Sequence, residues 1–185
     1  MSSALVTGAS SGIGREIART LAPMVDSLII SGRREEPLRD LEKELIGVVD
    51  VKVVIADLST ESGVDFLIEE AGDLDILVNN AGYGLYGRVA DQDPDKLLGI
   101  VDVNIRALTK LGHHHSTSMR MRGKGKILNV ASIAAFQPGP GLAVYCASKA
   151  YVLSLSRAMS AELKGSGVTV TALCPGYVET GFQST

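Results

Sequence analysis

The sequence predicts an α/β protein whose single sheet is open, parallel and doubly wound, with helices on both faces. Three observations lead to this class. Short apolar runs rich in β-branched residues recur along the chain, longer segments of helical spacing separate them, and a glycine-rich turn follows the first run. Continuously apolar runs suit strands that are covered on both faces, as in a parallel sheet. Repeated strand–helix–strand units with right-handed crossovers build a doubly wound sheet.

Six runs are expected as strands and five segments as helices. The strand pattern covers residues 4–6, 28–30, 51–56, 75–79, 126–131 and 168–174. Apolar residues three or four apart, with charges on the other side, occur in 13–21, 35–45, 62–71, 94–122 and 145–164. No internal repeat or linker interrupts this order, so one domain over residues 1–185 is expected. Ligands of such sheets bind beyond the carboxyl ends of the strands.

Composition and charge exclude several classes. Eighteen Lys and Arg against 21 Asp and Glu give a net charge of −3, so the chain lacks the positive field that gathers nucleic acid. Cys146 and Cys174 are not a CxxC pair, which argues against a zinc knuckle or a disulfide scaffold. No apolar run approaches the roughly 18 residues of a spanning helix, and no secretory leader is visible. We therefore expect a cytoplasmic protein that makes no contact with membranes.

The first candidate site is the glycine-rich turn after the first strand. Its sequence is Thr-Gly-Ala-Ser-Ser-Gly-Ile-Gly over residues 7–14. Glycines permit positive φ, and they let backbone N–H groups approach a pyrophosphate at the N-terminus of the next helix. A purely structural tight turn is the alternative. The candidate cofactor-binding residues here are Gly8, Ser10, Ser11, Gly12, Ile13 and Gly14.

The end of the second strand bears on the choice of cofactor. A site for NAD usually places a carboxylate there, about 20 residues after the glycines, on the ribose 2′-hydroxyl. This chain has Arg33 and Arg34 instead, and the first acid is Glu35. A guanidinium forms charge-assisted hydrogen bonds to a 2′-phosphate, so NADP(H) is favoured over NAD(H). A solvated pair of arginines before a helix is the alternative.

The third and fourth strands also end in polar turns. Asp57 and Leu58 follow the third strand, and Asp57 is either an acceptor for an adenine amino group or a local helix cap. The fourth strand runs into Asn-Asn-Ala-Gly at residues 79–82, a composition that also suits an ordinary turn. Because all these turns share one edge of the predicted sheet, we add five residues to the candidate cofactor site: Asp57, Leu58, Asn80, Ala81 and Gly82.

The reacting centre is predicted after the fifth strand. Ser132 ends that strand, and Tyr145 and Lys149 follow thirteen and seventeen residues later. In a helix, positions four apart share a face, with Cβ atoms roughly 5–6 Å apart. An ammonium beside a phenol favours the phenolate, so Lys149 is expected to lower the pKa of Tyr145. Tyr145 would then exchange a proton with a substrate oxygen, to which Ser132 donates a hydrogen bond.

These motifs, in this order and over nearly the whole chain, resemble the short-chain dehydrogenase/reductase family. The matching positions are 7–14, Asp57, 79–82, Asn104, Ser132, Tyr145, Lys149 and 175–176. The resemblance implies a Rossmann-like fold, a dinucleotide-binding domain, and NAD(P)(H)-dependent interconversion of a carbonyl and an alcohol in a small-molecule substrate. It also implies a homo-dimer or tetramer.

The resemblance implies roles that the residue pattern alone does not provide. Asn104 is expected to order a water in a proton relay through Lys149, which would also bond the ribose hydroxyls of the nicotinamide half. Pro175 and Gly176 match the segment that faces the nicotinamide. Val178, through its backbone, and Thr180, through its hydroxyl, are candidates to hold the carboxamide.

The sequence departs from the family pattern at two places. It ends shortly after the sixth strand, where relatives continue with a substrate-covering segment and a last strand; we expect a truncated reductase, with completion by a partner or an incomplete sequence as alternatives. The second departure is His113-His114-His115 in the long helix. Successive side chains point about 100° apart, so a metal site is disfavoured against a solvated or interfacial face. An interfacial position would make association sensitive to pH near 6–7.

Two functions of different classes follow. The first is an NADPH-dependent reductase of ketones or aldehydes that uses Asn104, Ser132, Tyr145 and Lys149. The second is an NADP(H)-binding sensor or interaction module without turnover. The complete set of catalytic side chains favours the enzyme, since a sensor needs none of them. Cys146 is not expected to be a nucleophile, because it faces away from Tyr145 and no histidine base is near it in the sequence.

Overall fold

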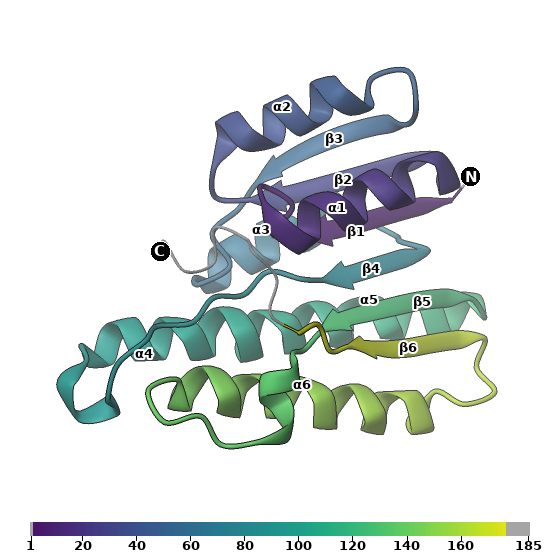
Figure 1. Ribbon diagram of the computed structural model, residues 1–185. Coiled ribbons are helices and arrows are strands. Elements are labelled where there is room, and N and C mark those ends of the chain that lie inside the picture. The colour runs from purple at the N-terminus through teal and green to yellow at the C-terminus, as the bar shows by residue number, and fades with distance from the viewer. Residues whose placement is uncertain (1, 177–185) are drawn as a thin grey trace.

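The computed structural model describes residues 2–176 and shows one parallel sheet of six strands (Figure 1). The strands are β1 (Ser3–Thr7), β2 (Ser27–Gly32), β3 (Asp50–Ile55), β4 (Ile76–Asn79), β5 (Gly125–Val130) and β6 (Val168–Leu173). Their order in the sheet is β3-β2-β1-β4-β5-β6, and every neighbouring pair is parallel. The predicted doubly wound sheet is confirmed.

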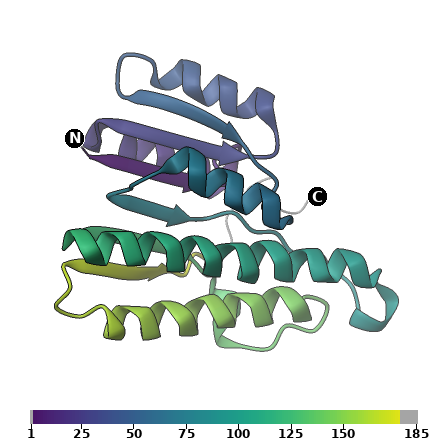
Figure 2. The ribbon, with the colours of Figure 1, turned by 180° about the vertical axis from the view of Figure 1, so that it is seen from behind.

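Helices cover both faces of this sheet. They are α1 (Gly12–Leu21), α2 (Glu35–Leu45), α3 (Glu61–Ala71), α4 (Pro94–Val101), α5 (Leu108–Arg122) and α6 (Ala143–Glu162). Short 3₁₀ turns lie at Ala22–Met24, Val89–Asp91 and Ile133–Phe136. Helices α1 and α2 pack on one face, and α3, α5 and α6 pack on the other (Figures 1 and 2). None of the described helices combines the length and hydropathy that crossing a bilayer requires.

One predicted helix, 94–122, is wrong in detail. Between α4 and α5 the chain forms a π-helical segment, Asp102–Ala107, whose turns are wider than those of an α-helix. Val103, Asn104 and Ala107 face the interior there. Apolar periodicity does not reveal such a segment, because the flanking helices keep one continuous buried face. Since π segments occur often at functional sites, this one marks Asn104 for attention.

Neighbouring residues of each central strand serve opposite layers of the core. In β1, Leu5 packs with the side chains of α3 and α5, whereas Val6 packs with those of α1 and α2. Both are completely buried. This two-sided burial explains why the strand sequences are continuously apolar and not alternating.

The strand order places the turns that follow β1 and β4 side by side. The chain leaves β3 at one edge and returns as β4 on the far side of β1, so the winding direction reverses between β1 and β4. Ligands of doubly wound sheets bind in the crevice at this reversal. In the described part of the chain, β6 is an edge strand, as expected. Its Thr169 and Thr171 side chains are exposed, and Val168 and Val170 face the core.

Candidate functional site

The glycines of the first turn are required by contacts within the protein itself. Gly8 has a φ of +67°, and a Cβ there would lie 2.8 Å from the Cα of Ala81. A Cβ on Gly14 would lie 2.4 Å from the carbonyl oxygen of Gly8. Both distances are too short for a side chain to fit. The turn therefore packs directly against the segment after β4. Gly8 and Gly14 are needed for this packing, whether or not the turn also binds a ligand.

Asn80 ties the glycine turn to the end of β4. Its Nδ2 donates to the carbonyl oxygens of Thr7 at 2.9 Å and Gly8 at 3.2 Å. The Thr7 hydroxyl in return accepts from the backbone N–H groups of Asn80 and Ala81, both at 3.0 Å. The side chain of Asn80 thus holds the turn in place through its Nδ2 group, and its contact with a cofactor stays a prediction.

The N-terminus of α1 has the features of an anion site. Ser11 is its N-cap and makes no side-chain capping bond, and the first turn holds no acidic residue. Arg34 crosses from the end of β2 and donates from Nη2 to the hydroxyls of Ser10 at 3.2 Å and Ser11 at 2.8 Å. Helix N–H groups, two hydroxyls and a guanidinium together suit a phosphate group. These residues fit the dinucleotide that the sequence predicts.

Asp57 has a local role at the end of β3. Its Oδ1 accepts from the backbone N–H of Ser59 at 3.0 Å and from the Ser59 hydroxyl at 2.8 Å. Burial raises its pKa, but these two bonds and the charge of Arg33 outweigh burial and hold the pKa below its usual value. The N-cap of α3 is Thr60, which accepts from Gly63 N–H. Leu58 is buried in the core, so only its backbone is available to a ligand.

Ser132, Tyr145 and Lys149 come together at the same edge of the sheet. Ser132 follows β5 and caps the next turn, where its hydroxyl accepts from the Ala134 N–H at 3.1 Å. Tyr145 lies in the first turn of α6, and its side chain forms a hydrogen bond with Ser132. The Lys149 Nζ lies 5.7 Å from the centroid of the Tyr145 ring. The predicted triad is therefore assembled.

Burial dominates the electrostatics of the triad. The Lys149 side chain is buried and donates from Nζ to the carbonyl oxygen of Val130 at 2.8 Å, and burial lowers its pKa to about 8. Burial raises the pKa of Tyr145, while the hydrogen bond with Ser132 acts in the opposite direction. The Lys149 ammonium donates to Val130 and also lies near the phenol ring, so the lowering of the Tyr145 pKa by Lys149 stays a prediction.

Asn104 links the π segment to two other segments: the loop after β4, through Tyr83, and helix α6, through Ser148. Its Oδ1 accepts from the backbone N–H of Tyr83 at 3.1 Å, and its Nδ2 donates to the Tyr83 carbonyl at 3.0 Å. The same Nδ2 donates to the hydroxyl of Ser148 at 3.0 Å, and Ser148 donates to the Tyr145 carbonyl at 2.7 Å. Both amide N–H groups of Asn104 are therefore engaged within the protein, and a water relay would rely on other atoms of this segment.

The sequence pattern missed two of these residues. Ser148 stands inside the Tyr-x-x-x-Lys motif, but its type suggests only a small helical residue. Gly84 packs against the phenol ring of Tyr145: a Cβ there would lie 2.9 Å from the ring carbon Cδ2. Both contacts depend on the π segment and on the path of the loop after β4, which periodicity does not determine.

The segment after β6 runs beside the turn that holds Ser132. The Pro175 carbonyl accepts from the Ile133 N–H at 3.1 Å, which brings residues 175–176 to the reacting edge as expected. The predicted nicotinamide contacts at Val178 and Thr180 lie outside the described residues.

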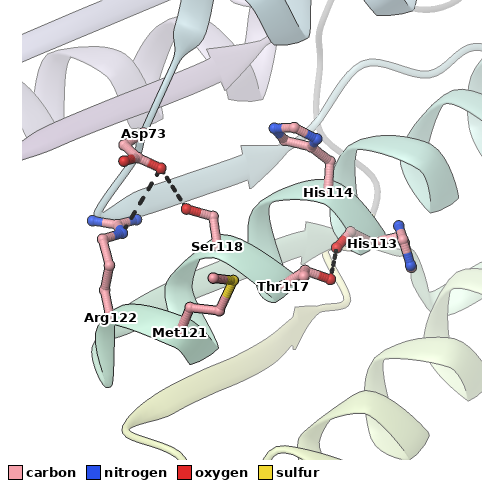
Figure 3. Close-up of a pocket in the computed structure, with 7 residues that line it drawn as sticks. All are labelled: Asp73, His113, His114, Thr117, Ser118, Met121 and Arg122. Atoms are coloured by element: carbon pink, nitrogen blue, oxygen red, sulfur yellow. Dashed lines mark hydrogen bonds and ion pairs between the residues drawn. The ribbon is translucent and has the colours of Figure 1, made fainter.

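The three consecutive histidines have different surroundings. His113 and His114 are exposed and line a pocket of about 340 Å³ on the outer side of α5, where their rings point away from each other (Figure 3). At the same pocket, Asp73 accepts from the Ser118 hydroxyl and pairs with Arg122. His115 instead turns inward, and the expectation of a solvated or interfacial face is wrong for it.

The side chain of His115 is buried in an apolar part of α5. It is 1% exposed, and neither ring nitrogen has a partner among the described residues. Burial, followed by the charge of His114, lowers the pKa of His115 to about 4; Asp73 opposes this and Arg122 adds to it. The imidazole is therefore neutral at physiological pH, and a switch near pH 6–7 at this residue is excluded.

The side chain of Cys146, on α6, packs against the loop that precedes this helix. It is buried, and a Cβ on Gly139 would lie 2.4 Å from its Sγ. The sulfur therefore fills space beneath the loop before α6, which agrees with the prediction that Cys146 is not a nucleophile.

Comparisons with known proteins agree with this arrangement. The family model described as short chain dehydrogenase matches residues 2–185. A 3-oxoacyl-(acyl-carrier-protein) reductase of Rickettsia prowazekii is 38% identical over 178 residues, which cover 95% of this chain and 72% of that protein. Sulfoacetaldehyde reductase 2 of Chromohalobacter salexigens is 39% identical over 184 residues, 96% of this chain and 73% of that protein.

A solved structure shows the same fold. The short-chain dehydrogenase from Sphingobium yanoikuyae in complex with NADPH superposes with a TM-score of 0.92 at 32% identity, over 98% of this chain and 73% of that one. The chain therefore belongs to the short chain dehydrogenase family and is an oxidoreductase that acts on the carbonyl–alcohol pair.

Proposed function

We propose that this chain is an NADP(H)-dependent carbonyl reductase in which Tyr145 is the proton donor. The observation that carries the proposal is the meeting of Ser132, Tyr145 and Lys149 at the sheet edge that also holds the glycine turn and the uncapped end of α1. A hydride donor anchored by its phosphates at α1 would lie on the same side of the sheet as the phenol.

Each side chain of the centre has a distinct task. Bound at this edge, the dinucleotide supplies the hydride that reduces the carbonyl carbon. Ser132 donates a hydrogen bond to the carbonyl oxygen and holds it beside the phenol. Tyr145 transfers its proton to that oxygen as the C=O bond becomes C–O, and the phenolate is reprotonated from solvent. Lys149 places a buried cation beside the tyrosine and stabilises the phenolate while it exists.

Tyr145 can act in either direction of the reaction. Burial raises its pKa, and the hydrogen bond with Ser132 opposes this. In carbonyl reduction the phenol donates its proton to the developing alkoxide, and in alcohol oxidation the phenolate accepts the proton of the hydroxyl.

The preference for NADP(H) rests on Arg33 and Arg34. Arg34 already lies on the serine hydroxyls of the glycine turn, and Arg33 is close enough to Asp57 to act on its pKa. The two guanidiniums therefore flank the predicted position of the adenosine ribose, where a 2′-phosphate adds two negative charges. The similar Sphingobium yanoikuyae protein has NADPH bound, which supports this choice.

Other parts of the proposal continue the sequence predictions. These are the single dinucleotide-binding domain over residues 1–185, the contacts of Val178 and Thr180, the cytoplasmic location and the homo-oligomer. The substrate is a small-molecule carbonyl compound.

The test is Tyr145→Phe, assayed by NADPH oxidation with a panel of aliphatic aldehydes, aryl ketones and β-keto esters. Loss of the proton donor is expected to lower kcat by at least about 100-fold, the usual contribution of general acid catalysis. NADPH affinity, measured by fluorescence titration, should change less than about threefold, since the phosphate site is intact. Parallel titrations with NADH should show weaker binding. Turnover by Tyr145→Phe at the unmodified rate would contradict the mechanism.

A further inference from the structure

Helix α6 carries two buried serines with the same bonding pattern at different distances from the reacting centre. Ser148 is fully buried and Ser156 is 1% exposed. Each hydroxyl accepts from the Nδ2 of an asparagine on another element and donates to a backbone carbonyl of the preceding turn of α6. The two serines differ in which parts of the protein their hydrogen bonds connect.

Ser148 connects the surroundings of Tyr145. Its hydroxyl donates to the Tyr145 carbonyl at 2.7 Å and accepts from Asn104 at 3.0 Å, and Asn104 in turn holds both backbone polar groups of Tyr83. Tyr83 is followed by Gly84, whose backbone lies against the Tyr145 ring. One hydroxyl therefore joins the tyrosine turn, the π segment and the loop that packs on the phenol.

Ser156 connects α6 to the paired strands β4 and β5 and makes no bond to the turn that holds Tyr145. Its hydroxyl donates to the Val152 carbonyl at 2.6 Å and accepts from Asn129 at 2.9 Å. Asn129 also accepts from Asn79 at 2.9 Å, where β4 and β5 are paired. The side chains linked by this chain of bonds are buried, and Tyr145 is three helical turns away on α6.

We propose that Ser148 is a positioning residue for Tyr145, an inference that rests on the proposed function. Acting through Asn104, its hydroxyl holds the first turn of α6 and the 83–84 loop in one arrangement, and so fixes where the phenol oxygen stands relative to Ser132. Ser148 touches neither substrate nor cofactor in this role.

The geometry explains why the effect should be on catalysis. Ser148→Ala leaves one Nδ2 hydrogen of Asn104 without its acceptor and frees the Tyr145 carbonyl from its side-chain bond. Asn104 then has only its bonds to Tyr83, and the loop loses its hydrogen-bonded connection to α6 while Gly84 still contacts the Tyr145 ring. A misplacement of about 1 Å at a reacting group costs up to about 100-fold in rate.

The experiment compares Ser148→Ala with Ser156→Ala, a control that removes the same type of hydroxyl from the same helix. Both variants should lower Tm by similar amounts, about 2–4 °C each, because each loses a pair of buried hydrogen bonds. Only Ser148→Ala should lower kcat, by about tenfold or more, with KM for NADPH unchanged. Ser148→Thr keeps a hydroxyl that can reach the preceding turn and should recover most of the activity.

A second readout needs no cofactor and no turnover. Amide hydrogen exchange of the unliganded chain should show faster exchange at Tyr83 and in the loop 82–85 for Ser148→Ala, because the Tyr83 N–H is held by Asn104. Ser156→Ala should leave the exchange of this loop as in the unmodified chain. Unchanged exchange at Tyr83 in Ser148→Ala would overturn the positioning role.

The outcomes separate this inference from the proposed function. If Tyr145→Phe abolishes turnover while Ser148→Ala and Ser156→Ala lose kcat equally, the mechanism stands and the special role of Ser148 is refuted. If Tyr145→Phe retains full turnover, the proposed mechanism fails, and the exchange measurement still decides whether Ser148 holds the 83–84 loop.

Discussion

Lys149 and His115 are two bases that the fold buries on the same side of the sheet, one on α6 and one on α5. Burial lowers the pKa of both, to about 8 for Lys149 and to about 4 for His115. The Lys149 Nζ has a hydrogen bond to the Val130 carbonyl and lies next to Tyr145. Neither ring nitrogen of His115 has a partner in the described chain.

This difference shows how a strongly shifted pKa should be interpreted. Shifted values concentrate at functional sites, but burial alone produces them as well. Lys149 meets the further conditions expected of a functional group: a fixed orientation, a neighbouring phenol at Tyr145 and a place at the carboxyl edge of the sheet. His115 meets none of them, so its shift is a statement about stability and not about chemistry.

The largest effect that would sharpen the comparison is expected from Lys149→Met. Methionine keeps the length of the side chain and removes the charge, so stabilisation of the Tyr145 phenolate is lost. We expect kcat to fall by about 100-fold or more in the NADPH oxidation assay. The Tm should move by only a few degrees, because the buried charge and its hydrogen bond disappear together. Full activity in Lys149→Met would show that the pKa of Lys149, like that of His115, is shifted by burial alone and has no role in catalysis.

The next effect is the acid sensitivity that His115 confers. Its pKa is about 4 in the folded chain against 6.5 when unfolded, so between these values the unfolded chain binds more protons. The stability associated with the neutral imidazole is complete above about pH 6.5 and is lost as pH falls towards 4. Its full size is about 3 kcal/mol, from about 1.4 kcal/mol for each pH unit between these two pKa values.

Urea denaturation at a series of pH values between 4 and 8 measures this loss. His115→Leu is the control, since leucine has no proton to bind, and its free energy of unfolding should depend less on pH across this window. Equal slopes in the two proteins would contradict a buried, neutral His115.

The smallest effect is expected at neutral pH. There, His115→Leu removes two buried nitrogens that have no partner within residues 2–176 and introduces an apolar side chain of similar size. We expect a gain of about 1–2 kcal/mol in the free energy of unfolding and no change in kcat. Calorimetry and the NADPH assay check the two parts. A destabilised variant would show that the contacts of the imidazole contribute more to the free energy of unfolding than the burial of its two nitrogens costs.

The sequence predicted the parts of the molecule that depend on periodicity and on local residue type. The strand over Leu28–Ile30 and the helix over 35–45 follow from their apolar spacing, and the meeting of Ser132 with Tyr145 follows from their place at strand and helix ends. Neighbouring turns at one sheet edge could be predicted because parallel strands all end there.

The rest depends on three-dimensional contacts that no local pattern records. The π segment arises where Asn104 turns towards Tyr83, within a run that reads as one continuous helix. The inward direction of His115 depends on how α5 is rotated against the sheet, because His113 and His114 have the same residue type and different exposure. The raised pKa of Tyr145 reflects burial, which residue spacing does not measure.

The close fit of Gly8 and Gly14 bears on how these glycines would be conserved if the enzyme lost its activity. Their missing side chains satisfy the architecture itself, since any Cβ would collide with Ala81 or with the Gly8 carbonyl. A descendant that had stopped turning over substrate would keep both glycines in order to fold. Substitutions would then be expected first at positions that the fold does not require, such as Arg34 and Tyr145. The glycine motif would persist in chains that no longer catalyse the reaction.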